Sequence, residues 1–294
     1  MDSKVTVIFL PSGKKNPSAE ALFQNDGRIE KILFAEEGDP GSSWNRMLKK
    51  SDSDFVLFLS DAVTGRKDDF LSRMLAAFSD EKTAAVSGRV IPAEKQASVK
   101  TAFQRFRYGA ERKEYDLSTL CLNGMRNFLL FNDCMMYKRA AFQENGLFEP
   151  ECLISPEILK AAELIYAGYR IVYEPAASVT AGTADMFADT FRKAFAFGAA
   201  ERVYIPVFGL NFEMVFSADA QHTYPVIQQD MRDFYKERGR AAAGELLKKG
   251  RILSAPFVRM QAGVLSFADF IGKRYHRLTV PMNRFFSGNR QFFG

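Results

Sequence analysis

Short apolar runs alternate with amphipathic segments along the first part of the chain. The runs lie at Val5–Leu10, Ile29–Phe34, Phe55–Leu59 and Ala84–Val90, and turn-forming or charged residues follow each of them. Apolar runs of this length are typical of strands that are covered on both faces of a sheet. Between the last two runs, Lys67–Phe78 carries apolar residues at helical spacing. This alternation predicts an α/β fold built on a parallel sheet.

The rest of the chain shows fewer strands and more helices. Pro156–Ala167 is a predicted helix, because proline stands in its first turn and a glycine follows its end. Tyr169–Tyr173 is a further predicted strand. Nearer the N-terminus, Ser42 or Ser43 is expected to cap a helix that ends near Lys50.

The composition suits a large α/β domain with an extension. The chain has 294 residues, of which 47% are hydrophobic and 26% charged, so it can bury a substantial core. We expect a sheet domain over residues 1–205 and a mainly helical extension over residues 206–294. The net charge of +5 is modest and acidic residues are mixed through most of the chain, so nucleic acid is not an expected partner.

The cysteines and the apolar runs bear on the compartment. Cys121, Cys134 and Cys152 show no CxxC spacing, which favours reduced thiols over a disulfide framework or a zinc site. The first apolar run lacks the basic flank and the cleavage site of a signal peptide. No run reaches the ~20 apolar residues that span a membrane. We therefore expect a cytoplasmic protein.

Candidate chemistry lies where the predicted strands end. In the stretch DFVLFLSDAVTG, Asp61 is the first charge after a buried strand, while Glu36 and Pro11 follow earlier strands. Ligands in open parallel sheets bind beyond the carboxyl ends of the strands. Carboxylates at such an edge suit Mg²⁺ or Mn²⁺ bridging a diphosphate, because these cations prefer oxygen ligands. A strand-end acid is equally compatible with a solvated or capping role.

Glu157 is a further candidate, in the first turn of the helix that precedes a strand. A parallel fold can bring this carboxylate to the edge that carries Asp61. The helix dipole alone also favours an acid in a first turn, so a purely structural role explains the residue as well.

Seven segments follow one another in the order found in a known family. They are VTVIFLP, AEEGD, SSWNRMLKKSDSDFVLFLSDAV, AAVSGRVIP, FNDCMMYKRAAFQENGLFEP, PEILKAAELIYAGYRIVYEPAASV and LSFADFIGKRYHRLTVPMNRFFS. In this order and at these distances the chain resembles family 2 glycosyltransferases of the GT-A fold, and in particular bacterial polysaccharide rhamnosyltransferases. The resemblance implies a GT-A-like, mostly parallel nucleotide-sugar-binding sheet with a mainly helical C-terminal extension.

The resemblance also implies an inverting glycosyltransferase. The donor would be a nucleotide sugar such as dTDP-rhamnose, and the acceptor a polysaccharide or a lipid-linked glycan. Pro11 and Glu36 would line the base and ribose pocket, and Asp61 would bind the metal that holds the diphosphate. Glu157 would take the proton of the acceptor hydroxyl, as a general base must reach the attacking oxygen.

Three further residues have both a functional and a local explanation. Asn45 would face the nucleotide or only the solvent. Arg89 would contact a phosphate or pair with a nearby acid, and Asp133 would face the acceptor or only hold a loop.

The chain departs from the family at three points. The family has Asp where Glu157 stands, and the longer side chain moves the carboxylate by about 1 Å, a shift that can cost ~10²-fold in rate. The His that usually follows the last strand is missing from the run 179–183, and only Asp61 remains of the family's Asp-x-Asp. An alternative therefore stays open: a catalytically degenerate protein that binds a nucleotide sugar or a glycan.

The C-terminal run FADFIGKRYHRLTVPMNRFFSGNRQFF interleaves aromatic and basic residues. This pattern is typical of a segment that lies on a membrane, and it predicts peripheral contact with the inner face near a lipid-linked acceptor. A helix that packs on the catalytic domain and exposes a basic face explains the same pattern.

Overall fold

The computed structural model forms two compact units, residues 1–184 with 240–258 and residues 185–239 with 259–294. The residues described are 3–11, 18–93, 109–123, 127–128, 132–150, 156–182 and 236–279. The domain boundary predicted near residue 205 lies outside them.

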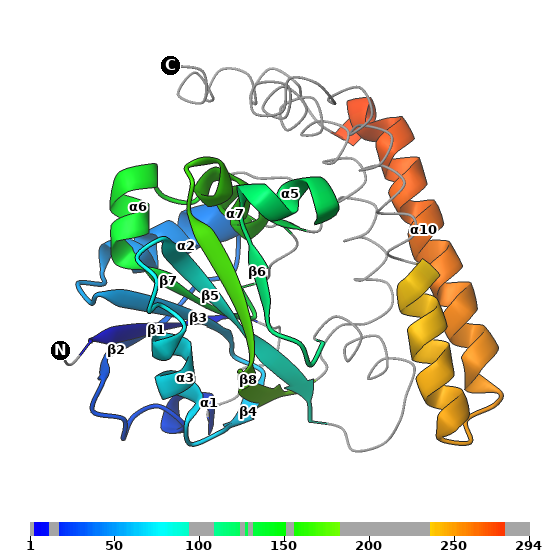
Figure 1. Ribbon diagram of the computed structural model, residues 1–294, viewed down its shortest axis with the longest axis horizontal. Helices are drawn as coiled ribbons and strands as arrows, with labels where there is room; N and C mark the ends of the chain where they lie inside the picture. The colour runs from blue at the N-terminus through cyan, green and yellow to red at the C-terminus, as the bar shows by residue number, and fades with distance from the viewer. Residues whose placement is uncertain are drawn as a thin grey trace. The chain divides into compact units, whose positions relative to one another are not determined.

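An eight-stranded mixed sheet forms the first unit, with the strand order β2-β1-β3-β7-β5-β8-β4 and with β6 paired to β8 (Figure 1). Parallel ladders join β1 to β2 and β3, and β5 to β8. The strands are β1 (Val5–Leu10), β2 (Ile29–Phe34), β3 (Phe55–Ser60), β4 (Val63–Arg66), β5 (Thr83–Pro92), β6 (Lys113–Tyr115), β7 (Cys134–Lys138) and β8 (Arg170–Ala181).

The predicted α/β fold is confirmed, and the sheet is mixed because β7 lies antiparallel between β3 and β5. Both neighbours of β7 in the sheet, β3 and β5, come before it in the chain. Local sequence patterns therefore could not predict that β7 lies between them. β4 and β6 also pair antiparallel to β8. Both are short strands that the apolar pattern did not predict.

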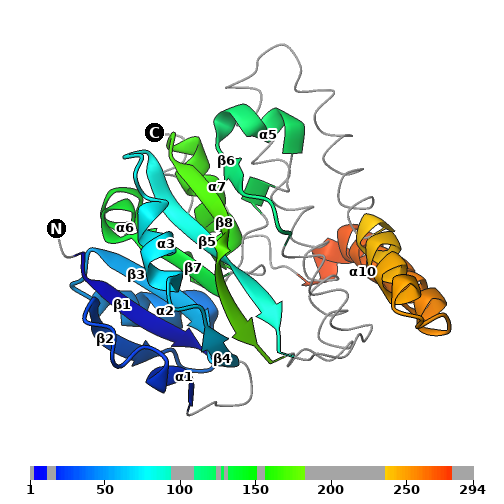
Figure 2. The ribbon, with the colours of Figure 1, turned by 60° about the horizontal axis from the view of Figure 1, so that its bottom comes forward.

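Helices cover both faces of the sheet. They are α1 (Ser18–Ala21), α2 (Pro40–Lys49), α3 (Phe70–Ala76), α5 (Leu117–Asn123), α6 (Arg139–Asn145) and α7 (Pro156–Tyr166). Figure 2 shows α1 and α3 on one face and α2 on the other. The α1 and α3 side encloses an apolar core in which Phe23, Phe70 and Met74 are fully buried. The other side packs aromatic rings: Trp44 and Tyr137 both lie against Phe58 and Phe148.

Helix α2 begins earlier than the sequence suggested. Asp39 is its N-cap and accepts a hydrogen bond from the Ser42 backbone N–H at 2.7 Å, while Pro40 occupies the first turn. The expectation that Ser42 or Ser43 caps this helix is therefore wrong. Ser43 instead bonds the strand end before the helix, as described below.

Among the described residues of the C-terminal part, two helices are present, at residues 236–248 and at α10 (Ser254–Thr279). Gly250 connects them with a positive φ of 71°, a conformation that glycine adopts without strain. Among the described residues, no helix is both long and apolar enough to cross a membrane.

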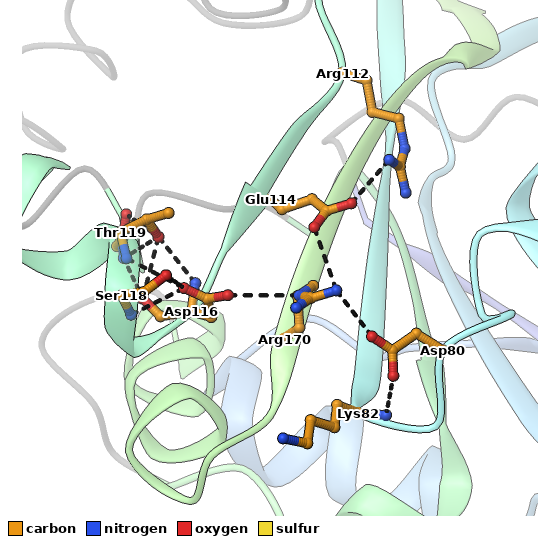
Figure 3. Close-up of polar contacts among 9 residues, drawn as sticks. Asp80, Lys82, Arg112, Glu114, Asp116, Ser118, Thr119 and Arg170 are labelled. Atoms are coloured by element: carbon orange, nitrogen blue, oxygen red, sulfur yellow. Dashed lines mark hydrogen bonds and ion pairs between the residues drawn. The ribbon is translucent and has the colours of Figure 1, made fainter.

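An ion-pair network joins the amino-terminal ends of β5 and β8 (Figure 3). Arg170 begins β8, and its guanidinium lies 2.8 Å from Asp80, 3.3 Å from Glu114 and 3.5 Å from Asp116. Asp116 also accepts hydrogen bonds from the backbone N–H groups of Ser118 and Thr119 at the start of α5. The network thus ties α5 and β6 to the edge of the sheet.

We expect Asp116→Ala to lower the free energy of unfolding by about 1–2 kcal/mol at neutral pH, because it removes a helix cap and one carboxylate of the network. Burial alone raises the pKa of Asp116, but hydrogen bonds from Ser118 and Thr119 and the charge of Arg170 hold it below the ordinary 3.8. The stabilisation is present above pH 3.8 and is lost as the pH falls through the lower folded-state pKa.

The difference between wild type and Asp116→Ala should therefore shrink between about pH 7 and about pH 3. Urea denaturation followed by the emission of Trp44, the single tryptophan, measures it. Asp68→Ala, at an exposed carboxylate, is the control and should change stability by less than ~0.5 kcal/mol. Equal losses from the two substitutions would contradict the assignment.

Candidate functional site

Four predicted residues lie in a row along the carboxyl edge of the sheet. The Asp61 N–H donates to the Leu10 carbonyl at 2.9 Å, which sets Asp61 beside Pro11. The Ser60 N–H donates to the Asp133 carbonyl at 3.0 Å. Because β2, β1, β3 and β7 are neighbours in the sheet, Glu36, Pro11, Asp61 and Asp133 follow one another along this edge. The predicted meeting of separate strand ends at one edge of the sheet therefore holds for Pro11, Glu36 and Asp61, whose roles stay predictions.

Asp61 is the buried carboxylate of this row, with 6% of its surface exposed. The end of β8 runs close to it, since the Gly182 N–H donates to the Ala62 carbonyl at 2.9 Å. Residues 179–182 therefore pass beside Asp61, and the run 179–183, where the resemblance implies a His, contains none in its sequence. In the part of the chain that is described, no three His, Cys, Asp or Glu residues gather around one point.

The residues present nevertheless fit a divalent cation held mainly by a substrate. Magnesium typically binds through one or two carboxylates together with the phosphate oxygens of its substrate, and it keeps several waters. Asp61 supplies one such carboxylate at the edge where a diphosphate would lie.

Glu36 lies on the turn after β2 and is largely exposed. Its carboxylate pairs with Arg46 at 2.7 Å, and 66% of its side chain is accessible. The turn itself is held firmly, because the Ser43 hydroxyl accepts from the Glu36 N–H at 2.9 Å and donates to the Glu36 carbonyl at 3.0 Å. Ser43 is buried and so fixes the backbone of Glu36 while leaving the carboxylate in solvent.

Asn45 has a role that the sequence did not suggest. Its side-chain amide donates to the Phe148 carbonyl at 2.7 Å and accepts from the Phe148 N–H at 2.9 Å. Close by, a Cβ on Gly41 would lie 2.2 Å from the Glu149 carbonyl oxygen, so only glycine allows the approach. Helix α2 thus holds residues 148–149, in the segment that leads to Glu157.

A buried lysine holds the same segment from the other side. Lys160 is 1% exposed, and its ammonium donates to the carbonyls of Asn145 and Gly146 at 3.1 Å each. It also pairs with Glu163. Burial raises the pKa of Glu163, and Lys160 partly lowers it again. A lysine on the apolar face of helix 156–166 is the signal that could have revealed this contact.

Glu157 lies in the first turn of α7 and is 5% exposed. Its charge acts on Tyr137, whose pKa is raised first by burial and further by Glu157. The Tyr137 hydroxyl donates to the Asn132 amide oxygen at 2.8 Å. Asn132 directly precedes Asp133, so the Tyr137 hydroxyl, on which the charge of Glu157 acts, is bound next to Asp133.

Arg89 lies on β5, opposite Ser178 in the ladder with β8. Burial raises the pKa of the Tyr173 phenol, and the charge of Arg89 lowers it only in part. The Tyr173 hydroxyl donates to the Gly109 carbonyl at 2.7 Å. A phosphate-binding role for Arg89 stays a prediction.

Two curated relatives match nearly the whole chain. The O-antigen chain rhamnosyltransferase WbaN of Salmonella anatum is 26% identical over 271 residues, which cover 89% of this chain and 78% of the relative. The O-antigen chain rhamnosyltransferase RfbN of Salmonella typhimurium is 24% identical over 295 aligned residues, covering 98% of this chain and 86% of the relative. No protein-family model matches the chain.

A solved structure supports the fold. It is the mannosyltransferase PcManGT from Pyrobaculum calidifontis in complex with GDP-Man and Mn²⁺, with a TM-score of 0.54, 15% identity, and coverage of 93% of this chain and 87% of that chain. This likeness bears on the fold alone. Together the comparisons confirm the predicted resemblance to bacterial rhamnosyltransferases and favour a glycosyltransferase over a degenerate binding protein.

We expect Asn45→Ala to lower the free energy of unfolding by about 1–3 kcal/mol, because it leaves the Phe148 backbone groups without their partners. It should also lower the turnover number more than it weakens donor binding, since the loosened segment leads to Glu157. Urea denaturation and steady-state kinetics measure the two effects.

The matched control is Asn25→Ala, which truncates an exposed asparagine and should change stability by less than ~0.5 kcal/mol. If Asn45→Ala instead lost much of its nucleotide affinity while its stability stayed unchanged, the result would show that Asn45 contacts the nucleotide directly.

Proposed function

We propose that the chain is an inverting glycosyltransferase that moves a sugar from a nucleotide-sugar donor to a polysaccharide or lipid-linked acceptor. The observation that carries the proposal is the row of Pro11, Asp61 and Asp133 at adjoining strand ends. The buried Glu157 at the start of α7, whose charge acts on Tyr137, supports it. The two O-antigen rhamnosyltransferases among its relatives support rhamnose as the transferred sugar.

The donor lies along the ends of β2, β1 and β3 in this proposal. Pro11 and the turn at Glu36 line the base and ribose, and Ser43 keeps that turn rigid. Asp61 would hold a divalent cation, and Arg89 would add positive charge to the phosphate side. When bound, Mg²⁺ or Mn²⁺ neutralises the charge that develops on the departing diphosphate.

Glu157 takes the proton from the acceptor hydroxyl as that oxygen attacks the anomeric carbon. The start of α7 suits this role, because the positive end of a helix dipole stabilises a carboxylate there. Lys160 contributes indirectly, since it joins α7, the helix that carries Glu157, to the end of α6, and Asn45 holds Phe148 after that end. Asp133 contacts the acceptor from the start of β7.

The donor side is tested by calorimetric titration with dTDP, UDP and GDP, each with and without Mn²⁺. We expect tight binding of one nucleotide that depends on the metal. In Asp61→Asn the metal dependence should disappear and the affinity should fall by about tenfold or more, because the carboxylate on the cation is lost. Asp68→Asn, at an exposed carboxylate, is the control.

Binding that ignores the metal in the wild type would remove the metal site from the proposal. No binding of any of the three nucleotides would overturn the transferase function as stated.

The acceptor side is tested with Glu157→Gln, which keeps the shape of the side chain and removes its basicity. Turnover should fall by about 10²–10⁴-fold while the nucleotide Kd stays unchanged, because a general base acts only in the chemical step. Release of nucleoside diphosphate from the matching sugar donor, with bacterial membrane extract as the acceptor, measures turnover. The control is Glu81→Gln, at an exposed side chain. Wild-type turnover in Glu157→Gln would remove Glu157 from the mechanism.

A further inference from the structure

Helix α10 has two apolar faces, and one of them is covered. Its buried residues recur at helical spacing and none is more than 5% exposed. They are Ala255, Val258, Ala262, Leu265 and Ala268. Burial of this face stabilises the helix within the folded protein.

The second apolar face is open. Six large apolar side chains on α10 and the turn before it are exposed: Ile252 69%, Leu253 86%, Phe257 60%, Met260 57%, Phe267 58% and Phe270 41%. Most of them lie three or four residues apart and therefore share one side of the helix. Single exposed apolar residues are ordinary, but a row of this length marks an interaction surface.

The charges beside this row have one sign. Arg251, Arg259 and Arg274 are exposed on α10 or immediately before it. The sequence from 246 to 294 contains one acidic residue, Asp269. A surface that combines a row of aromatic and aliphatic side chains with arginines complements an apolar layer beneath anionic headgroups.

A second copy of the chain is the other partner that this row suits, because apolar residues spaced three and four positions apart also form coiled coils. Coiled coils set their partner and direction with charged pairs beside the seam. Here the positions beside the row are Pro256 and Gly263 on one flank and Gln261 and Ala268 on the other. These positions offer no pair of opposite charges. Arg274 would continue the row and would face the Arg274 of the second copy.

We infer that the exposed row of α10 lies in the surface of a membrane that contains anionic lipids, with the helix axis parallel to that surface. The phenylalanines and Met260 enter the boundary between headgroups and acyl chains, and the arginines contact lipid phosphates. This surface stands on α10 alone and does not depend on the proposed sugar transfer. If both hold, it brings the catalytic unit to acceptors carried on lipid.

Flotation of the full chain with lipid vesicles tests the inference. We expect binding to phosphatidylcholine vesicles that contain phosphatidylglycerol, and several-fold weaker binding to pure phosphatidylcholine. The double variant Phe257→Ser with Phe267→Ser should bind the anionic vesicles about tenfold more weakly or worse, because the apolar anchors are lost. High salt should weaken the wild type, since the screening length falls to ~3 Å at 1 M.

Phe34→Ser is the matched control, because it removes a phenylalanine that is 47% exposed on the edge strand β2. This control should bind vesicles as the wild type does. Circular dichroism checks that the double variant keeps its helices.

Three outcomes would overturn the inference: no vesicle binding by the wild type, equal binding by the double variant, or equal loss in Phe34→Ser. A wild type that does not bind vesicles but sediments as a dimer, with the double variant sedimenting as a monomer, would assign the surface to a second copy. Nucleotide titration separates this test from the proposed function, because the double variant should bind nucleotide as the wild type does. Vesicle binding without any nucleotide binding would support the membrane-binding surface and contradict the proposed transferase function.

Discussion

The candidate site depends on one constraint, the hydrogen bonding of the end of β3 to strands on both sides. The Asp61 N–H reaches the carbonyl at the end of β1, and the Ser60 N–H reaches the carbonyl before β7. A backbone held by neighbours on both sides cannot shift along its own axis without breaking both ladders. Asp61 and Asp133 are therefore fixed by main-chain geometry, independent of the side chains that they carry.

The segment that follows α6 is fixed by different means. Residues 146–150 form no strand or regular ladder, and side chains from two helices hold this region. Asn45 binds both backbone groups of Phe148, and Lys160 binds two carbonyls at the end of α6. The Phe148 ring then fills the aromatic cluster around Phe58. An irregular segment held in this way combines the reach of a loop with the rigidity of a packed core.

The Arg170 network and the candidate site lie at opposite edges of the sheet. The Arg170 network lies at the amino-terminal ends of β5 and β8, where three carboxylates surround one guanidinium. Partly exposed pairs of this kind contribute modestly one by one, and their main effect is to hold β6 and α5 in place. The carboxyl edge instead carries Glu36, which is exposed and paired with Arg46, and Asp61, which is buried at a strand end.

The sequence by itself determined the elements that depend on local periodicity. The apolar runs predicted β1, β2, β3 and β5, and the first charge after one of these runs identified Asp61. The order of the motifs identified the resemblance to glycosyltransferases before any contact was known. Local patterns suffice here because burial on both faces of a strand appears directly as a continuous apolar run.

Only the tertiary structure decided which strands are neighbours and what the polar side chains bind. The insertion of β7 between β3 and β5, the bond of Asn45 to a residue 103 positions away, and the burial of Lys160 all depend on contacts remote in sequence. Asparagine and lysine are usually exposed, so residue type alone does not indicate that these two side chains are bound inside the protein. The partner that makes burial favourable exists only once the chain has folded.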